Sequence, residues 1–366
     1  MTAVPVLTRR TLNRTLLERQ LLTGRTAHSA LAAVEHLVAL QGQEPNWPYV
    51  GLWTRLRDFR HDDLTSLLED RRVVRATLLR GTQHLVSGED FRWLRPVVQP
   101  VLDRIARAPY FATEAGGLDL AELVEAGRVL LAGRTLPRRQ LGRLLAERFP
   151  GRDGRVLAGV VELRAALVHA PATGAWGAWG NRGAISVTPA EAWLGRPMAD
   201  ERRVELMIRR YLAAFGPASV VDIQAWSGLT RLRGAVDGLR PQLRVFRDEG
   251  GRELFDVADA PLTAADLPVP VRFLPAYDNL LLGHADRTRV LNAEDRPRVM
   301  PGGAAVRPTF LVDGFVRGTW ALKGSTLRLS PFRPLSEADT AAVLEEAGRL
   351  LAFVAADTAE RDIAFD

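Results

Sequence analysis

Apolar and polar positions repeat one order of elements along the chain. Runs with helical spacing of apolar residues come first, and two β-rich runs joined by a turn follow them. The helical runs lie at residues 10–22, 27–41, 61–72, 118–133, 135–149, 153–167, 201–216, 219–229 and 230–240. The two-stranded runs lie at residues 73–87, 167–187 and 243–257. This order is typical of winged-helix units, so the pattern predicts three of them in series.

The pattern changes after Pro261, where short strand-like runs replace the helices. An amphipathic helix with a serine cap is expected after them, over residues 336–357. We therefore expect an α+β fold of three tandem winged-helix units with a C-terminal β-rich extension and a terminal helix. The expected regions are 1–112, 113–196, 197–260 and 261–366, with the last packed on the third unit.

The charge balance permits a polyanionic partner without requiring one. The 366 residues include 49 basic and 43 acidic side chains, which give a net charge of +6. Lys323 is the one lysine, a bias that a GC-rich genome would also produce. Arginine forks suit phosphate groups, so the composition is compatible with contact to double-stranded DNA. The absence of cysteine excludes disulfides, thiol nucleophiles and cysteine-bound metals.

Common targeting and catalytic signatures are missing. The N-terminal stretch carries arginines through its apolar positions, so it does not resemble a signal peptide. No run approaches the roughly 18 apolar residues of a membrane span. The histidines lack metal-binding spacing, and phosphate-loop and dinucleotide motifs are absent. We expect a cytoplasmic monomer with no membrane contact, no metal and no cofactor.

Two neutral amides, Gln41 and Gln43, flank Gly42 where the helical run 27–41 stops. Continued helical spacing places Gln41 on the inward face, Gly42 ends the helix, and Pro45 keeps it from resuming. An extended segment then turns Gln43 to the same side, because extended chains alternate with a period of two. Such a pair is able to orient a water molecule but is not a strong base. From spacing alone, the simpler interpretation is that both glutamines cap the helix end or face water.

Four stretches in one order resemble the winged-helix DNA glycosylases of the AlkZ and YcaQ type. They are LVALQGQEPNWPYVGLW, LLRGTQHLVSGEDFRWLRP, YDNLLLGHADRTRVL and LVDGFVRGTW, and the resemblance covers nearly the whole chain. In that family a Gln-x-Gln motif is catalytic, and a Gln-x-Asp motif takes its place in the YcaQ-like branch. The resemblance implies that Gln41 and Gln43 are catalytic and that this sequence is of the AlkZ type.

The resemblance also implies a substrate. The family excises N7-alkylated guanine from DNA, and its AlkZ-like members unhook interstrand crosslinks made by alkylating natural products, in DNA repair and toxin self-resistance. An N7-alkylated guanine is already cationic and leaves readily, so positioning one water against the sugar carbon suffices. A crosslinked guanine is tethered to the opposite strand, which disfavours full extrusion and favours an open, C-shaped DNA-binding cleft.

Basic residues near these stretches are candidates for contact with DNA. The set is Arg80, His84, Arg182, Arg298 and Arg307. Taken singly, each arginine is more simply an ordinary surface residue, and His84 a buried histidine with a satisfied hydrogen bond. As a set they are able to line a concave basic groove.

Three further residues are candidate supports of the site: Trp47, Asp278 and His284. Core packing is the simpler interpretation for Trp47, and a turn or a buried hydrogen bond for Asp278. Two other functions stay open, namely a non-enzymatic winged-helix transcription regulator and a self-resistance protein that sequesters an adduct without cleaving it. Release of alkylguanine from DNA separates an enzyme from both.

Overall fold

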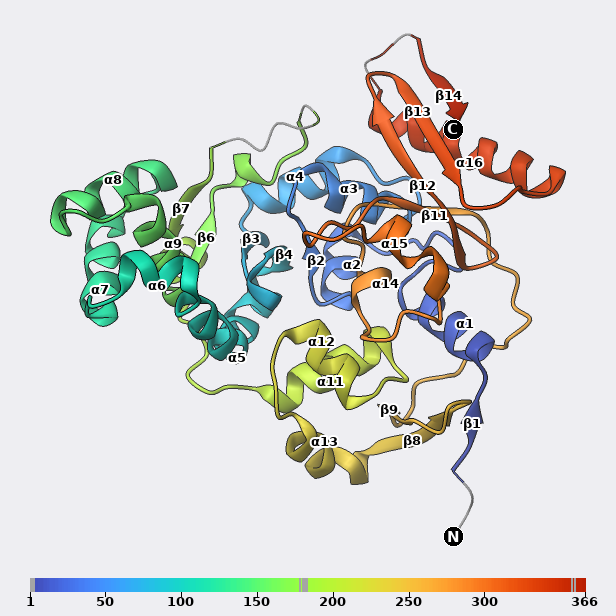
Figure 1. The fold of residues 1–366 in the computed structure, drawn as a ribbon, viewed down its shortest axis with the longest axis horizontal. Coiled ribbons are helices and arrows are strands. Elements are labelled where there is room, and N and C mark those ends of the chain that lie inside the picture. Colours follow the sequence, from blue (N-terminus) through green and yellow to red (C-terminus); the bar gives the residue numbers. More distant parts are fainter. Residues whose placement is uncertain (1–3, 178, 180–183, 357, 359) are drawn as a thin grey trace.

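The computed structural model describes residues 4–177, 179, 184–356, 358 and 360–366. It has an α+β fold in which groups of helices alternate with short hairpins (Figure 1). The strands in these ranges form sheets of three, five and six strands. No helix in the same ranges is long and apolar enough to cross a membrane.

The first segment contains the predicted hairpin and two strands that the sequence pattern did not predict. Its helices are α1 (Arg9–Arg19), α2 (Ala30–His36), α3 (Asn46–Trp53), α4 (His61–Glu69) and α5 (Gly88–Ala106). Its strands are β1 (Val6–Leu7), β2 (Leu40–Gln41), β3 (Val73–Thr77) and β4 (Gln83–Ser87). β3 and β4 pair antiparallel, which confirms the hairpin at residues 73–87. Of the two unpredicted strands, β1 and β2, the second pairs with β4 and carries the first glutamine of the motif.

The chain around the glutamines differs from the predicted helix. α2 ends at His36, and Val38 takes a left-handed conformation with a φ of 68° that turns the chain into β2. Gln41 therefore lies on a strand, and the predicted helix end at this residue is wrong. The expectation that Pro45 blocks a new helix is also wrong, because Pro45 is the N-cap of α3. Proline is tolerated there since the first turn of a helix needs no backbone donor.

The second segment repeats the order of helices and hairpin. Its helices are α6 (Pro109–Ala115), α7 (Leu120–Leu131), α8 (Arg138–Arg148), α9 (Gly154–Arg164) and α10 (Ala190–Leu194). Its strands are β5 (Leu136–Pro137), β6 (Leu167–His169) and β7 (Ser186–Pro189). Apart from β1, the strands of both segments form one sheet of order β2-β4-β3-β6-β7-β5, in which Arg75 of β3 pairs with His169 of β6. A single sheet thus connects the second hairpin to the strand that carries Gln41.

The third segment and the C-terminal region complete the fold. The third segment has helices α11 (Val204–Phe215), α12 (Val220–Ser227) and α13 (Arg233–Leu239) and a hairpin of β8 (Leu243–Asp248) and β9 (Glu253–Val257). β1 adds to this hairpin in parallel with β8. The C-terminal region contains β10 (Arg272–Leu274), α14 (Asn279–Leu282), α15 (Arg296–Val299), β11 (Thr309–Val312), β12 (Phe315–Lys323), β13 (Thr326–Pro331), α16 (Glu337–Val354) and β14 (Asp362–Phe365). Its strands lie in sequence order in one sheet.

The C-terminal region packs on the first segment as well as on the third. One buried cluster joins Leu350 of α16 with Val34 of α2 and Leu52 of α3. Another joins Leu280 of α14 with Tyr211 of α11. The C-terminal region was expected to pack on the third unit, and its contacts with α2 and α3 of the first segment were not predicted.

Candidate active site

Gln41 is held by an arginine from the turn of the first hairpin. It lies on β2 opposite His84 of β4, and it is only 8% exposed. Its Oε1 accepts a hydrogen bond of 2.8 Å from Nη2 of Arg80. A guanidinium has only donors, so the oxygen of the amide must face Arg80 and the nitrogen must face away. This contact sets the orientation of the Gln41 amide.

Arg80 joins Gln41 to the third segment. It lies in the turn between β3 and β4 with a φ of 55°, and its Nη1 donates to the carbonyl of Trp226 in α12. Burial, with a smaller contribution from the charge of Arg287, lowers the pKa of Arg80 to about 10, so it stays protonated at neutral pH. The guanidinium bonds inside the protein, whereas the sequence suggested a contact with DNA.

Gln43 is held by the backbone of the same hairpin. Its Oε1 accepts a hydrogen bond of 3.2 Å from the N–H of Gln83, and the N–H of Gly42 donates to the carbonyl of Gln83 at 2.8 Å. A backbone N–H only donates, so the orientation of the Gln43 amide is set as well. The glycine between them has a packing reason, because a Cβ at Gly42 would lie 2.6 Å from Cδ1 of Leu85. Gly42 permits close approach to β4 and does not end a helix.

Both amide oxygens keep capacity for a water molecule. An amide oxygen has two lone pairs, and each of the bonds to Arg80 and Gln83 uses one. The other lone pair is able to accept a hydrogen from water, which leaves an oxygen lone pair of the water free to attack. Because amides do not titrate, the arrangement suits orientation of a nucleophile and not abstraction of its proton.

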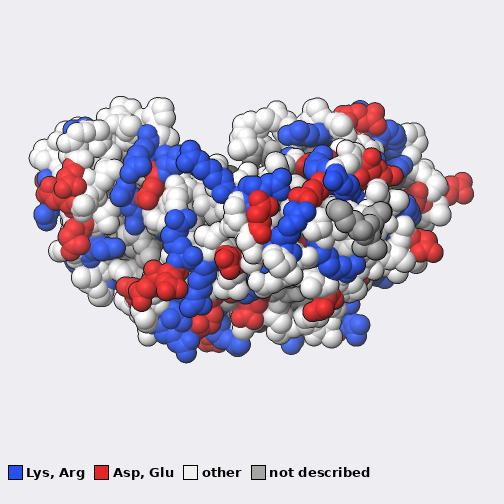
Figure 2. Space-filling view, turned by 90° about the horizontal axis from the view of Figure 1, so that it is seen from below, with Lys and Arg blue, Asp and Glu red and all other residues white. Residues whose placement is uncertain are grey.

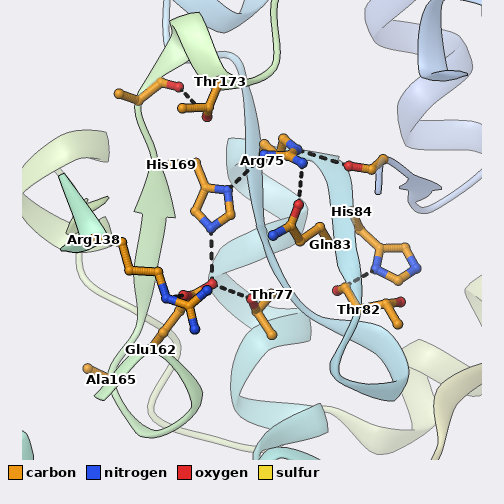
Figure 3. A network of polar contacts seen from close by, with 12 residues as sticks. Arg75, Thr77, Thr82, Gln83, His84, Arg138, Glu162, Ala165, His169 and Thr173 are labelled. Atoms are coloured by element: carbon orange, nitrogen blue, oxygen red, sulfur yellow. Dashed lines mark hydrogen bonds and ion pairs between the residues drawn. The ribbon is translucent and has the colours of Figure 1, made fainter. Parts of the chain in front are cut away.

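A buried network of charged and polar side chains contacts the backbone of Gly42 and Gln43, and Figure 3 shows its members Arg75, His169 and Glu162. Arg75 of β3 donates to the carbonyl of Gly42 at 3.0 Å and to the carbonyl of Gln43 at 3.3 Å. On its other side, Arg75 lies 3.2 Å from Nδ1 of His169 in β6. Nε2 of His169 in turn lies 3.1 Å from a carboxylate oxygen of Glu162 in α9. Arg75, His169 and Glu162 were not among the site residues that the sequence predicted.

His84 is buried beside Gln41. It is 1% exposed, and its Nδ1 lies 3.0 Å from the carbonyl of Thr82. A carbonyl only accepts, so Nδ1 carries the proton. Burial, followed by the charge of Arg80, lowers the pKa of His84 to about 3, which keeps the ring neutral. This position matches the interpretation of His84 as a buried histidine with a satisfied hydrogen bond.

The remaining candidates for contact with DNA lie on other elements. Arg298 of α15 and Arg307, which precedes β11, are both exposed. Arg298 also donates to the carbonyl of Phe332 at 2.9 Å. No hydrogen bond among the described residues joins either arginine to the two glutamines. Arg182 lies outside the described residues.

Asp278 and His284 are both buried and contact other residues of the fold. Asp278 accepts hydrogen bonds of 2.8 and 2.9 Å from Arg55 and caps α14. His284 lies with Nε2 at 3.1 Å from the carbonyl of Phe215, and burial lowers its pKa to about 3. The ion pair matches the interpretation of Asp278 as a buried hydrogen-bond partner.

Aromatic rings gather next to the motif. Trp47 of α3 lies against Trp179, with ring centroids 4.9 Å apart, and edge-on to Trp320 at 5.7 Å. The preceding residue, Asn46, exchanges hydrogen bonds of 2.8 and 3.1 Å with the backbone of Gly177. These contacts favour the packing interpretation of Trp47 and attach the loop after β6 to the start of α3.

Arginines concentrate on hollowed parts of the surface. Figure 2 shows a depression between a left-hand lobe and the larger right-hand part, with Lys and Arg side chains along it. A groove of about 600 Å³ in the second segment is lined by four arginines of α8 and α9: Arg138, Arg139, Arg143 and Arg155. Both features suit a polyanionic partner.

Comparison with known proteins gives the class and then the family. A family model described as "DNA glycosylase AlkZ-like" matches residues 34–353, so this chain is a DNA glycosylase. It belongs to the AlkZ-like DNA glycosylase family. The result confirms the family and the enzyme class that the sequence predicted.

Two relatives show how far the similarity extends. An interstrand DNA cross-link repair glycosylase from Streptomyces sahachiroi is 28% identical and aligns over 91% of this chain and 93% of that protein. The solved structure of the Streptomyces sahachiroi DNA glycosylase AlkZ matches with a TM-score of 0.81 and 22% identity, covering 99% of this chain and 100% of that chain. The second match supports the overall fold.

Proposed function

We propose that this glycosylase hydrolyses the N-glycosidic bond of N7-alkylated guanine, including bulky adducts and interstrand crosslinks made by alkylating natural products. The observation that carries the proposal is a pair of amides whose oxygens are oriented by obligate donors, Arg80 for Gln41 and the N–H of Gln83 for Gln43. The crosslink repair glycosylase of Streptomyces sahachiroi, similar over nearly the full length, supports the substrate class. Repair of such lesions gives the producer of a DNA-alkylating compound a means of self-resistance.

The reaction needs little acid or base chemistry from the protein. Alkylation at N7 leaves the guanine ring cationic, so the C1′–N9 electron pair moves into the ring and neutralises it as the bond breaks. The oxygen of a water molecule bonds to C1′, and the water loses one proton to solvent. Gln41 and Gln43 accept hydrogen bonds from this water and hold its oxygen toward C1′ as positive charge develops on the sugar.

The protein binds double-stranded DNA as a monomer in a C-shaped cleft. We propose three winged-helix units for this purpose, at residues 1–112, 113–196 and 197–260, with residues 261–366 as a supporting region. The basic depression in Figure 2 supports the cleft. We retain Arg182, Arg298 and Arg307 as proposed phosphate contacts. Because their contacts lie inside the protein, we assign Arg80 and His84 to holding β2 and Gln41.

Replacement of the two glutamines tests the proposal. We expect Gln41→Ala and Gln43→Ala to slow single-turnover release of N7-methylguanine by about 100-fold to 1,000-fold, as loss of one positioned polar group does elsewhere. The affinity for alkylated DNA should stay within about twofold of wild type. Gln242→Ala, at an exposed glutamine, is the matched control and should retain the full rate.

Two outcomes would redirect the assignment. Full activity of both variants, with intact DNA binding, would remove the glutamines from the mechanism. Tight binding of a defined N7 adduct without release of base under single-turnover conditions would instead indicate sequestration. A panel of N7-methylguanine, a bulky N7 monoadduct and a defined crosslink then identifies the preferred lesion.

A further inference from the structure

Arg75 donates hydrogen bonds to the segment that carries Gln43. It lies in the middle of β3 and is only 2% exposed. Nε donates to the Gly42 carbonyl, and Nη2 donates to the Gln43 carbonyl and to Oε1 of Gln83. Three neutral oxygen acceptors around one planar guanidinium fix the carbonyl directions of two successive residues. The directions of these two carbonyls fix the backbone position from which the Gln43 side chain extends.

The opposite edge of the guanidinium is bonded to the second segment. Nη1 of Arg75 lies 3.2 Å from Nδ1 of His169, and since arginine only donates, Nδ1 must be the unprotonated nitrogen. The ring proton is then on Nε2, which lies 3.1 Å from Oε1 of Glu162 and donates to it. His169 therefore links the arginine to a carboxylate as a neutral, singly protonated ring.

Glu162 is held charged at the far end of this link. Its Oε1 also accepts a hydrogen bond of 2.5 Å from Thr77, and its Oε2 lies 3.2 Å from Nε of Arg138 in α8. Burial raises the pKa of Glu162, but the hydrogen bond from His169, the charge of Arg138 and the hydrogen bond from Thr77 outweigh it and keep the pKa below its ordinary value. Burial lowers the pKa of Arg75 to about 10, against the opposing charge of Glu162. Both groups are therefore ionised at neutral pH.

The network crosses from one segment to the other. Arg75 and Thr77 belong to β3, whereas His169 and Glu162 belong to β6 and α9, and the β3–β6 contact places Arg75 opposite His169 (Figure 3). The hydrogen-bonded chain thus runs from a helix of the second segment, across the shared sheet, to the backbone of the Gln-Gly-Gln segment.

We infer that Arg75 is a positioning residue for the glycosylase reaction, and that His169 and Glu162 hold it so that Gln43 is presented at a fixed angle to the attacking water. The inference rests on the proposed function of Gln43. It assigns the second segment a role in catalysis besides any contact it makes with DNA.

Variants of Arg75 and Glu162 provide the test. We expect Arg75→Lys to slow single-turnover base release from N7-methylguanine DNA by about 10-fold to 100-fold, because a single ammonium cannot hold both carbonyls and small displacements are costly to the rate. Glu162→Gln keeps the shape of the carboxylate but removes its charge and should slow release by about 3-fold to 10-fold. The DNA affinity of both variants should match that of wild type within about twofold.

Arg14 offers a matched control. It is also buried, and it donates to the backbone carbonyls of Leu267 at 2.8 Å and Asp313 at 3.0 Å. It binds the C-terminal region and not the Gln-Gly-Gln segment. Arg14→Lys should therefore lower the thermal midpoint of unfolding as Arg75→Lys does, while the rate per correctly folded molecule stays at the wild-type value.

The double variant separates positioning from general stability. If Arg75 acts through Gln43, Arg75→Lys combined with Gln43→Ala should release base no more slowly than Gln43→Ala alone, per active molecule counted by DNA titration. Three results would each overturn the inference: a wild-type rate in Arg75→Lys, an equal loss in Arg14→Lys, or fully additive losses in the double variant. Full activity of Gln43→Ala alone would contradict the proposed function of Gln43, and this result is distinct from the three above.

If Arg75→Lys does not fold, Glu162→Gln replaces it. The rate of Glu162→Gln combined with Gln43→Ala is then compared with the rate of Gln43→Ala alone.

Discussion

The two ends of the Gln-Gly-Gln segment are held in different ways. Gln41 belongs to the ladder between β2 and β4, and one side chain, Arg80, orients its amide. Gln43 lies beyond the strand, where a backbone N–H orients its amide and Arg75 holds its carbonyl. One half of the motif is therefore anchored through a side chain and the other half through the main chain.

The two arginines also differ in what balances their charge. Arg75 reaches the carboxylate of Glu162 through His169. Within the described ranges, no acidic side chain forms an ion pair with Arg80, whose bonds go to neutral oxygens. The Arg80 side of the motif is therefore held by neutral oxygens alone, whereas the Arg75 side is held by a chain of contacts that ends in a carboxylate.

The largest expected effect comes from Arg80→Met, which keeps an apolar stem but removes the donor to Gln41. The freed amide loses its fixed orientation, so single-turnover release of N7-methylguanine should fall by about 100-fold. Arg80→Lys keeps the charge but cannot bond both the Gln41 oxygen and the Trp226 carbonyl, so an intermediate loss is expected. Equal rates in Arg80→Met and wild type would contradict the orienting role.

Salt dependence tests whether both arginines bond inside the protein. Loss of one phosphate contact reduces the slope of log affinity against log salt by about 0.9. Because the donors of Arg80 and Arg75 go to acceptors inside the protein, Arg80→Met and Arg75→Lys should both keep the wild-type slope. A slope reduced by about 0.9 in Arg80→Met would instead place Arg80 against a DNA phosphate.

Most of the predicted helices and hairpins are present in the fold, but the sequence predicted neither β2 nor the buried network around Arg75. Local patterns predicted the hairpin at residues 73–87, and the resemblance singled out Gln41 and Gln43. The strand β2 was missed because two residues carry too little alternation to compete with a helical run. Arg75 and His169 are 94 positions apart, and only the register of β3 against β6 brings them together. A single sequence does not encode that register in any local signal.

A smaller effect is expected for the pH dependence of the free energy of unfolding, through His84, which lies opposite Gln41 in the sheet. His84 has a pKa lowered to about 3 by burial and by the charge of Arg80, against an ordinary value of 6.5. Between pH 6.5 and pH 3 the His84 side chain of the unfolded chain binds a proton that the folded chain does not. The contribution of His84 to the free energy of unfolding is therefore complete above pH 6.5 and is lost as the pH falls. At pH 5.5 the loss from this residue is about 1.4 kcal/mol relative to neutral pH.

Urea unfolding at pH 7.5 and pH 5.5 measures this loss. His84→Gln should shrink the difference between the two free energies of unfolding by about 1.4 kcal/mol. His284 has a similarly lowered pKa and contributes a further loss that this variant retains. An undiminished pH dependence in His84→Gln would show that His84 is not buried as a neutral ring beside Gln41.

The smallest effect is expected from arginines that touch neither end of the motif. Arg298 and Arg307 are exposed, so the variant with both replaced by glutamine should keep the wild-type rate at saturating DNA. If each contacts one phosphate, the slope of log affinity against log salt should fall by about 1.8, since each contact contributes about 0.9. Arg349→Gln, at an exposed arginine paired with Glu345 on α16, is the control and should keep the wild-type slope. An unchanged slope in the double variant would place both arginines away from the DNA backbone, and a reduced rate at saturation would tie them to the motif instead.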